Sequence, residues 1–147
     1  DVRTKHDLSS LKVAIHAAAP CPVDVKHAMI AWWGPVIYEY YSATEGAGFT
    51  AISPQEWLAR PGSVGKSILG EIRVLDDEGR RLGPNQTGRI FFHGGGSFSY
   101  HNDPEKTASV MGEHGATFGD IGHVDEDGYL FLTDRQAFMI ISGGVNV

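Results

Sequence analysis

The chain has 147 residues, of which 41% are hydrophobic, and this is enough apolar material for one compact domain or a large part of one. The formal net charge is −6 and no run of lysine or arginine occurs, so nucleic acid and anionic membranes are disfavoured as partners. One cysteine, Cys21, excludes an internal disulfide framework, and no apolar run has the length of a transmembrane segment; we therefore expect a cytoplasmic protein.

Both ends of the sequence resemble interior segments of a longer chain. The sequence starts at Asp1, without an initiating methionine or a signal-peptide core. At the other end, Val147 follows closely on the glycine pair Gly143–Gly144, where a turn should lead into a further element. We expect this chain to be a fragment.

The first third of the chain predicts a strand, a helix and a second strand. Leu11 to His16 alternates apolar and polar residues and ends at the small, proline-bounded stretch 17–20. Apolar residues then recur at helical spacing from Pro22 to Gly34, and residues 35–41 form another run rich in β-formers. This order is typical of the edge of a parallel α/β sheet.

From about Gly62 the sequence changes to short β runs separated by glycine. These runs are Glu71 to Leu75, Gly88 to Phe92, His123 to Val124, Tyr129 to Thr133 and Phe138 to Ile141. The acidic stretches 76–79 and 125–128 each end in glycine and lie between two such runs, which predicts tight hairpins. The second part of the chain is therefore expected to be mostly antiparallel β.

One helix interrupts the β runs, and one turn marks a boundary. A short helix is predicted from Asp103 to Met111, with Asn102 or Asp103 as N-cap and proline in its first turn. Ser53 to Gln55 predicts a turn between an α/β segment, 1–55, and a β-rich segment, 56–147. The expected fold class is α+β: a strand-helix-strand edge of an α/β subdomain followed by a β-barrel-like, mostly antiparallel subdomain.

Two familiar sites are not predicted. The run Gly94–Ser97 lacks the Lys-Ser/Thr pair of a phosphate loop, so we expect these glycines to turn the chain. The histidines share no metal-ligand spacing, so surface or core positions are expected for them.

Polar residues able to bind a nucleotide follow the second predicted strand. Tyr41 offers a face on which a base can stack, worth about 1 to 3 kcal/mol. Thr44 can donate a hydrogen bond to a phosphate oxygen, and Glu45 can hold Mg²⁺ together with substrate phosphates. The ends of strands are where α/β folds bind ligands.

Two later residues have matching chemistry. Asp120 can accept hydrogen bonds from both hydroxyls of a ribose, and Arg135 has a forked cationic donor group for ribose or phosphate. Taken singly, each of these residues also suits an ordinary structural role, such as a turn, a cap or a surface ion pair. Spacing alone favours the structural roles.

Five distinctive strings follow one another along the chain: YSATEG at 41–46, SVGK at 63–66, YHNDPEKT at 100–107, FGDIGHVDEDGYLFLTDR at 118–135 and MIISGGVNV at 139–147. In order and spacing they resemble core motifs of the adenylate-forming (AMP-binding) superfamily. The resemblance covers essentially the whole chain and is greatest to fatty-acyl-CoA and related carboxylate–CoA ligases. The fourth string is too long and specific for a chance match.

The resemblance implies a nucleotide site built from distant residues. The implied cofactor-binding residues are Ala19, Glu39, Tyr40, Tyr41, Thr44, Asp120 and Arg135. By this resemblance Tyr41 stacks on adenine, residues 39 and 40 border the adenine edge, and the small side chain at 19 lies against the same nucleotide. Asp120 would bind both ribose hydroxyls with help from Arg135.

The same resemblance implies catalytic roles for Thr44 and Glu45. Thr44 would contact the α-phosphate of ATP, and Glu45 would bind Mg²⁺. A small-molecule carboxylate must attack that phosphate, so two anions approach and catalysis is mostly positioning and charge neutralisation. The resulting acyl-AMP would be opened by coenzyme A. The implied parent is an ATP-dependent acyl-CoA synthetase, an acid–thiol ligase acting on a carboxylic acid of the fatty-acid class.

The chain departs from the family pattern at several positions. Ser42 replaces a glycine, Ala17 and Ala18 replace a glycine pair, and Ala137 and Phe138 occupy the family's hinge. The family's phosphate loop would precede this segment, and its catalytic lysine would follow in a mobile C-terminal domain, a partner within the same protein. We therefore expect the isolated segment to be inactive.

Two alternatives stay open. The parent could load a carrier protein instead of coenzyme A, or the chain could be a nucleotide-binding or structural module without activity. Thr44, Glu45, Asp120 and Arg135 together count against the structural module, because a pure scaffold has no physical need for all four.

Overall fold

The computed structural model of the chain describes residues 5–135, 141–142 and 145–146, the last six of these (134–135, 141–142 and 145–146) by their backbone alone. The helices are α1 (Val23–Trp33), α2 (Pro54–Ala59) and α3 (Pro104–Val110). The strands of the main sheet are β1 (Ala14–His16), β2 (Ile37–Ser42), β3 (Phe49–Ile52), β4 (Ser63–Leu69), β5 (Glu71–Leu75), β6 (Gly88–His93), β7 (Met111–Gly112), β8 (Gly115–Ala116), β9 (Asp120–Val124) and β10 (Leu130–Arg135). A separate pair consists of β11 (Ile141–Ser142) and β12 (Val145–Asn146).

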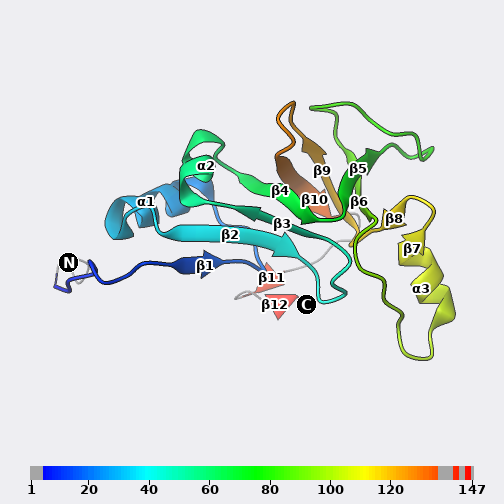
Figure 1. Ribbon diagram of the computed structural model, residues 1–147, viewed down its shortest axis with the longest axis horizontal. Coiled ribbons are helices and arrows are strands. Elements are labelled where there is room, and N and C mark those ends of the chain that lie inside the picture. The colour runs from blue at the N-terminus through cyan, green and yellow to red at the C-terminus, as the bar shows by residue number, and fades with distance from the viewer. Residues whose placement is uncertain (1–4, 136–140, 143–144, 147) are drawn as a thin grey trace.

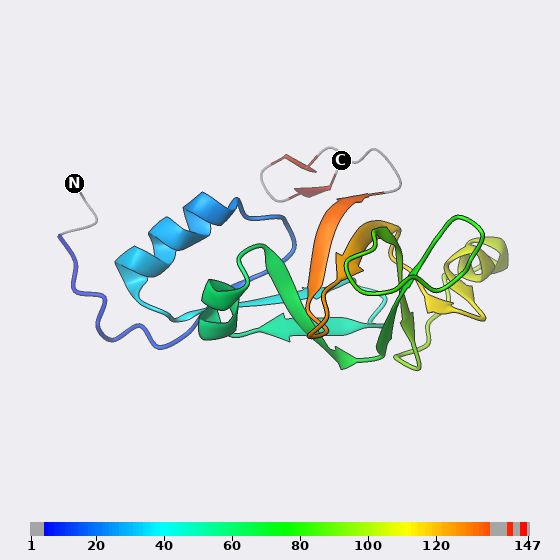
Figure 2. The same cartoon turned by 90° about the horizontal axis from the view of Figure 1, so that it is seen from above.

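One sheet connects the two parts of the chain. Its strand order is β1-β2-β3-β4-β10-β9-β6-β8-β7, with β5 paired to β6. The β1–β2 pairing is parallel, and the other pairings among the described strands of this sheet are antiparallel. Strands β2 and β3 follow the long axis of the molecule, whereas β9 and β10 cross it steeply (Figures 1 and 2). The predicted α+β class is confirmed, and over the described strands the sheet stays open.

The predicted helix near residues 22–34 is confirmed as α1. Pro22 precedes its first turn, and Gly34 ends it with a φ of 84°, its N–H donating to Ile30 O at 2.8 Å. A left-handed residue at this point is most easily supplied by glycine, which has no Cβ to clash.

The turn predicted at Ser53–Gln55 is instead the start of α2. The Ser53 hydroxyl accepts from the Glu56 N–H at 3.3 Å, and the Glu56 carboxylate accepts from the Ser53 N–H at 2.9 Å. This reciprocal capping box, with Pro54 in the first turn, stabilises a helix of only six residues. The proposed boundary between 55 and 56 stays a prediction, and β3 and β4 pair across it.

The two acidic stretches turn as predicted but lead to different pairings. Gly79 (φ 79°) and Gly128 (φ 88°) are left-handed, and their N–H groups donate at 3.1 Å to the carbonyls of Asp76 and Asp125. The second turn joins β9 to β10. The first is followed by an isolated bridge between Leu75 and residue 81 and by a bond from the Leu82 N–H to Val74 O, but the strand that pairs with β5 is β6, which begins later.

The remaining predicted elements are confirmed in part. Helix α3 matches the prediction, with Asp103 as its N-cap. Strand β9 begins at Asp120, earlier than the predicted His123, and the sequence did not indicate β3 or β4. Most of the run Phe138 to Ile141, with part of the MIISGGVNV string, lies outside the described residues. No helix in the described part of the chain is long and apolar enough to cross a membrane.

Strand β4 holds the sheet together at its centre. Gly65 has a φ of 96°, and a Cβ there would lie 2.0 Å from the carbonyl oxygen of Ala51 in β3. On the other side, the buried Ser63 hydroxyl donates to Leu130 O in β10 at 2.9 Å. The SVGK string therefore serves packing, since only glycine allows β3 to approach this closely.

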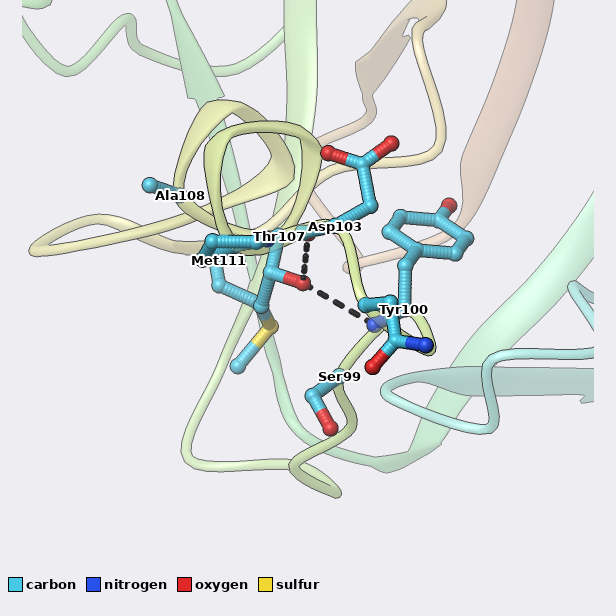
Figure 3. Close-up of a pocket in the computed structure, with 8 residues that line it drawn as sticks. Ser99, Tyr100, Asp103, Thr107, Ala108 and Met111 are labelled. Carbon is cyan, nitrogen blue, oxygen red and sulfur yellow. Dashed lines mark hydrogen bonds between the residues drawn. The ribbon is translucent and has the colours of Figure 1, made fainter.

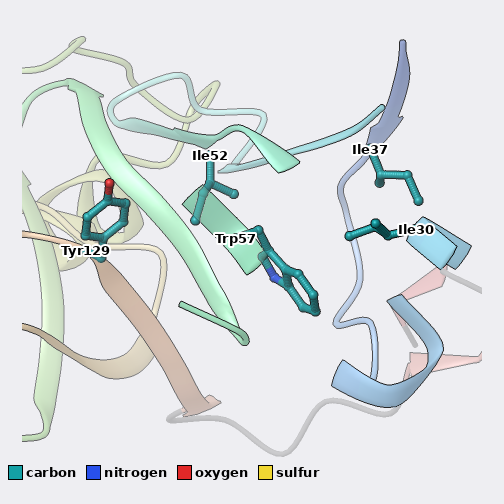
Figure 4. Close-up of a cluster of buried hydrophobic side chains, with 5 residues drawn as sticks. All are labelled: Ile30, Ile37, Ile52, Trp57 and Tyr129. Carbon is teal, nitrogen blue, oxygen red and sulfur yellow. The ribbon is translucent and has the colours of Figure 1, made fainter. Parts of the chain in front are cut away.

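Two apolar clusters lie along the sheet. The first packs α1 and α2 against the strands through Ile30, Ile37, Ile52, Trp57 and Tyr129, with Trp57 only 1% exposed (Figure 4). The second consists of Val64, Ile90, Phe92 and Leu130 and is bordered by Tyr41 and Phe118. Buried side chains of this size contribute about 1.5 to 3 kcal/mol each.

A buried ion pair sits beside the first cluster. Lys26 of α1 is 2% exposed, donates a hydrogen bond to Glu39 of β2, and lies 4.5 Å from the ring centroid of Trp57. His16 of β1 approaches the other Glu39 oxygen at 3.3 Å. Burial raises the pKa of Glu39, but hydrogen bonds and charges from His16 and Lys26 outweigh this and lower it. The carboxylate is therefore ionised and neutralised by its neighbours.

Replacing Lys26 with alanine should destabilise the chain by about 3 to 5 kcal/mol, because the Glu39 charge would remain buried without its cation. Chemical denaturation measures the loss. Lys12→Ala is the control, since that side chain is exposed and bonds only to Ser9 O, and it should change stability by less than about 0.5 kcal/mol. Equal losses for the two variants would contradict the assignment.

Candidate functional site

The loop after β2 carries Thr44 and Glu45. A turn from Ala43 to Gly46 is closed by the Gly46 N–H donating to Ala43 O at 2.9 Å, and Gly46 has a φ of 65°. Thr44 is exposed and Glu45 is half-buried. The turn thus presents both side chains just beyond the end of the strand, where the sequence predicted them to act.

The glycine run after β6 packs directly against this loop. Gly94 turns the chain with a φ of 69°, as expected. A Cβ on Gly95 would lie 1.9 Å from Ala47 O, and one on Gly96 would lie 2.5 Å from Gly46 O. Gly95 and Gly96 therefore allow two backbone segments to touch. The sequence prediction missed this role.

Hydroxyl groups orient the Glu45 carboxylate. Tyr100 donates to Oε1 at 2.7 Å, and Thr44 donates to Oε2 at 3.2 Å. Burial raises the pKa of Glu45, but hydrogen bonds from Tyr100, the backbone and Thr44, together with the charge of Lys106, lower it below its ordinary value. Glu45 is therefore an anion at neutral pH. Tyr100 was not among the predicted site residues, although it begins the YHNDPEKT string.

A single ionised carboxylate of this kind fits Mg²⁺ bound with a nucleotide. Mg²⁺ commonly takes one or two carboxylates and completes its shell with water and phosphate oxygens. No cluster of three or more His, Cys, Asp or Glu able to hold a metal occurs among the residues that the structure describes. Glu45 could thus hold Mg²⁺ only where phosphate oxygens supply further ligands.

Tyr41 and Asp120 meet from distant parts of the chain. The Tyr41 hydroxyl donates to Asp120 Oδ2 at 2.5 Å, and Asp120, the first residue of β9, is 4% exposed. The Tyr41 ring lies 6.1 Å, centroid to centroid, from both Phe92 and Phe118. The second apolar cluster therefore fixes the ring, and the ring hydroxyl contacts the carboxylate.

The other predicted residues lie around these two groups. Arg135 pairs with Asp120 across β9 and β10, which puts its backbone beside that residue; its side chain lies outside what the structure describes. Tyr40 stacks on Phe49 at 4.9 Å. The Glu39 carboxylate is engaged by the buried ion pair, and Ala19 lies half-buried in the loop between β1 and α1.

A family model described as AMP-binding enzyme matches residues 2–100. The chain belongs to this family. A long-chain-fatty-acid–CoA ligase of Bacillus subtilis is 30% identical over 145 residues, which are 97% of this chain and 26% of the relative. The chain thus spans about a quarter of the length of these curated relatives.

Two solved structures place the fold within the same family. Amide bond synthetase McbA from Marinactinospora thermotolerans superposes with a TM-score of 0.87 at 32% identity, covering 99% of this chain and 30% of that one. An O-succinylbenzoate–CoA synthetase from Bacillus subtilis, in complex with ATP and magnesium ion, gives 0.74 at 25% identity, covering 95% and 31%. The arrangement of strands and helices described above is therefore that of part of an AMP-binding enzyme.

One departure from the AMP-binding enzyme pattern has a conformational cost. Ala18, where the resemblance expects glycine, has a φ of 73°. A left-handed conformation costs a residue with a Cβ about 1 to 2 kcal/mol. The loop that carries Ala19 is therefore strained at the preceding residue.

Ala18→Gly should raise the free energy of unfolding by about 1 kcal/mol, because glycine adopts this φ without strain. Ala17→Gly is the matched control, since Ala17 is not among the residues with positive φ. This variant should have a free energy of unfolding lower by about 0.5 to 1 kcal/mol, because glycine gives the unfolded chain greater freedom. Denaturant unfolding of both variants gives the sign of each change in the free energy of unfolding. A destabilising Ala18→Gly would contradict the strain.

Proposed function

We propose that the chain is part of an AMP-forming acid–thiol ligase that activates a carboxylic acid of the fatty-acid class as acyl-AMP and transfers it to coenzyme A. The main observation in support is the hydrogen bond between Tyr41 and Asp120, which lie far apart in sequence. It joins the residue proposed to stack on adenine to the one proposed to bind ribose. The fatty-acid–CoA ligase among the relatives supports the substrate class.

The nucleotide would lie between the two groups of residues. Tyr41 offers its ring to adenine, and Asp120 accepts hydrogen bonds from the ribose hydroxyls. Arg135 would assist on the ribose side, and Glu39, Tyr40 and Ala19 would border the base. The Glu39 carboxylate is held by Lys26 and His16. Glu39 would therefore border the base through its position in β2 and not through its carboxylate.

The first reaction joins two anions. A carboxylate oxygen of the acid attacks the α-phosphorus of ATP, and the bond to pyrophosphate breaks, which yields acyl-AMP. The Thr44 hydroxyl, which donates to Glu45 in this structure, would turn its one proton to an α-phosphate oxygen, while Glu45 stays ionised and would supply a ligand to the cation. Bound Mg²⁺ supplies charge neutralisation. The B. subtilis synthetase structure with ATP and magnesium ion supports this assignment.

The second reaction transfers the acyl group. The sulfur of coenzyme A attacks the acyl carbonyl, and AMP leaves while the thiol proton passes to solvent. The phosphate loop and the catalytic lysine would come from other parts of a longer cytoplasmic enzyme, the lysine from a C-terminal domain. An amide bond synthetase among the structural neighbours favours testing another acceptor class, and a phosphopantetheinyl carrier protein is the second candidate acceptor.

The 147-residue chain alone should release no pyrophosphate from ATP and a fatty acid above a Glu45→Ala background, because it lacks the phosphate loop and lysine expected of the family. The full-length enzyme should release pyrophosphate and form acyl-CoA. Acyl-CoA, acyl-carrier and amide products, separated by mass spectrometry, distinguish the acceptors. Pyrophosphate release by the chain alone would refute the proposal that the phosphate loop and the catalytic lysine come from other parts of a longer enzyme.

In the full-length enzyme, Asp120→Ala should weaken ATP binding by about 10- to 150-fold, since a hydrogen bond to a charged group contributes about 1.5 to 3 kcal/mol. Titration calorimetry measures the affinity. Asp127→Ala serves as the control, because that carboxylate is 63% exposed and lies in the β9–β10 turn. An unchanged ATP affinity in Asp120→Ala would remove Asp120 from the site.

A further inference from the structure

The YHNDPEKT segment brings one tyrosine onto the candidate metal carboxylate from another part of the chain. Tyr100 and Glu45 are 55 positions apart, and the tyrosine hydroxyl donates to Glu45 Oε1 at 2.7 Å. The second oxygen accepts from Thr44. Each carboxylate oxygen has two lone pairs, so one hydroxyl donor at each oxygen fixes the group and still leaves acceptor capacity for a cation.

The rest of the segment fixes Tyr100. Its backbone N–H donates to the Thr107 hydroxyl at 2.9 Å, and this hydroxyl donates to the carbonyl of Asp103 at 2.8 Å (Figure 3). The Asp103 carboxylate accepts from the Lys106 N–H at 2.9 Å and so caps α3. The ammonium of Lys106 lies 4.3 Å from the centroid of the Tyr100 ring. The segment is thus a small folded unit that presents one side chain to Glu45.

We propose that Tyr100 is a positioning residue that sets the affinity of the Glu45 site for a divalent cation. The proposal rests on the proposed function, in which Glu45 binds Mg²⁺. Residues that orient metal ligands through hydrogen bonds typically change metal affinity or activity by about 10- to 100-fold when they are removed. The Tyr100 hydroxyl donates its hydrogen bond to Glu45, and we assign it no role toward the nucleotide, so nucleotide binding without metal should not depend on this hydroxyl.

The test uses Tyr100→Phe in the full-length enzyme. Titration calorimetry gives the affinity for the α,β-methylene analogue of ATP, first in EDTA and then at saturating Mg²⁺, and the ratio of the two is the gain due to the metal. We expect Tyr100→Phe to reduce this gain by about 10-fold or more while the affinity in EDTA stays within about twofold. An unchanged affinity in EDTA also shows that the variant is folded.

Two further variants sharpen the result. Tyr38→Phe is the matched control, because Tyr38 is 42% exposed on β2, and its metal-dependent gain should equal that of the parent enzyme. Thr107→Val, which removes the hydroxyl that holds the Tyr100 backbone, should reduce the gain in the same direction by a smaller factor. A full gain in Tyr100→Phe would overturn the proposal, whatever the result for Thr107→Val.

Glu45→Gln separates this inference from the proposed function. If Glu45→Gln abolishes the metal-dependent gain and Tyr100→Phe keeps it, the positioning role is wrong and the metal role of Glu45 stands. If Glu45→Gln keeps the full gain, Glu45 is not the metal ligand and both proposals fall. With Glu45 replaced, the further change of Tyr100 to Phe should have no additional effect on the gain, because the two residues act as one unit.

Discussion

The close pairing of β4 with its two neighbours is the constraint on which the rest of the structure depends. Gly65 lets β4 approach β3, and Ser63 bonds across to β10. Through β4, the α/β edge and the antiparallel strands become one sheet. This continuity helps to bring the end of β2, with Tyr41, to the start of β9, with Asp120. A site made of residues so far apart exists because the sheet is not interrupted between them.

Two carboxylates in this fold are both ionised, but for different physical reasons. Glu39 is neutralised by the cation of Lys26, so its charge is already balanced within the protein. Glu45 is held by hydroxyl groups, which orient it without cancelling its charge. A metal ion gains electrostatic energy from an anion such as Glu45, whose side-chain hydrogen-bond donors among the described residues are hydroxyl groups. The kind of partner, more than burial, therefore decides which of the two carboxylates suits an external cation.

The elements predicted correctly are those determined by local sequence. Helix α1, the cap of α3 by Asp103, and the turn at residues 125–128 depend on neighbours within a few positions. Helix α2 carried an equally local signal, the pair of Ser53 and Glu56, which was outweighed by the turn preference of Ser-Pro. The pairing of strands β3 and β4 is set by partners across the sheet, which sequence patterns do not reveal.

The candidate site divides in the same way. Thr44, Glu45 and Asp120 could be chosen from the sequence because their motifs are distinctive. The contact from Tyr100 and the burial of Lys26 could not, because both depend on which distant residues the fold brings close. Motif resemblance indicates which residues matter, and three-dimensional packing indicates what each one touches.

The glycine run after β6 also links the mechanics of two segments. Gly95 and Gly96 meet the loop at residues 46–47 backbone to backbone, with no side chain between them to deform. A side chain in such a contact could change its rotamer and absorb a small displacement, whereas two backbone segments in direct contact move together. A rearrangement of the loop that carries Glu45 would therefore be transmitted to the end of β6. We therefore expect the loop to move with the sheet framework, because Gly95 and Gly96 have no side chains to separate the two backbones.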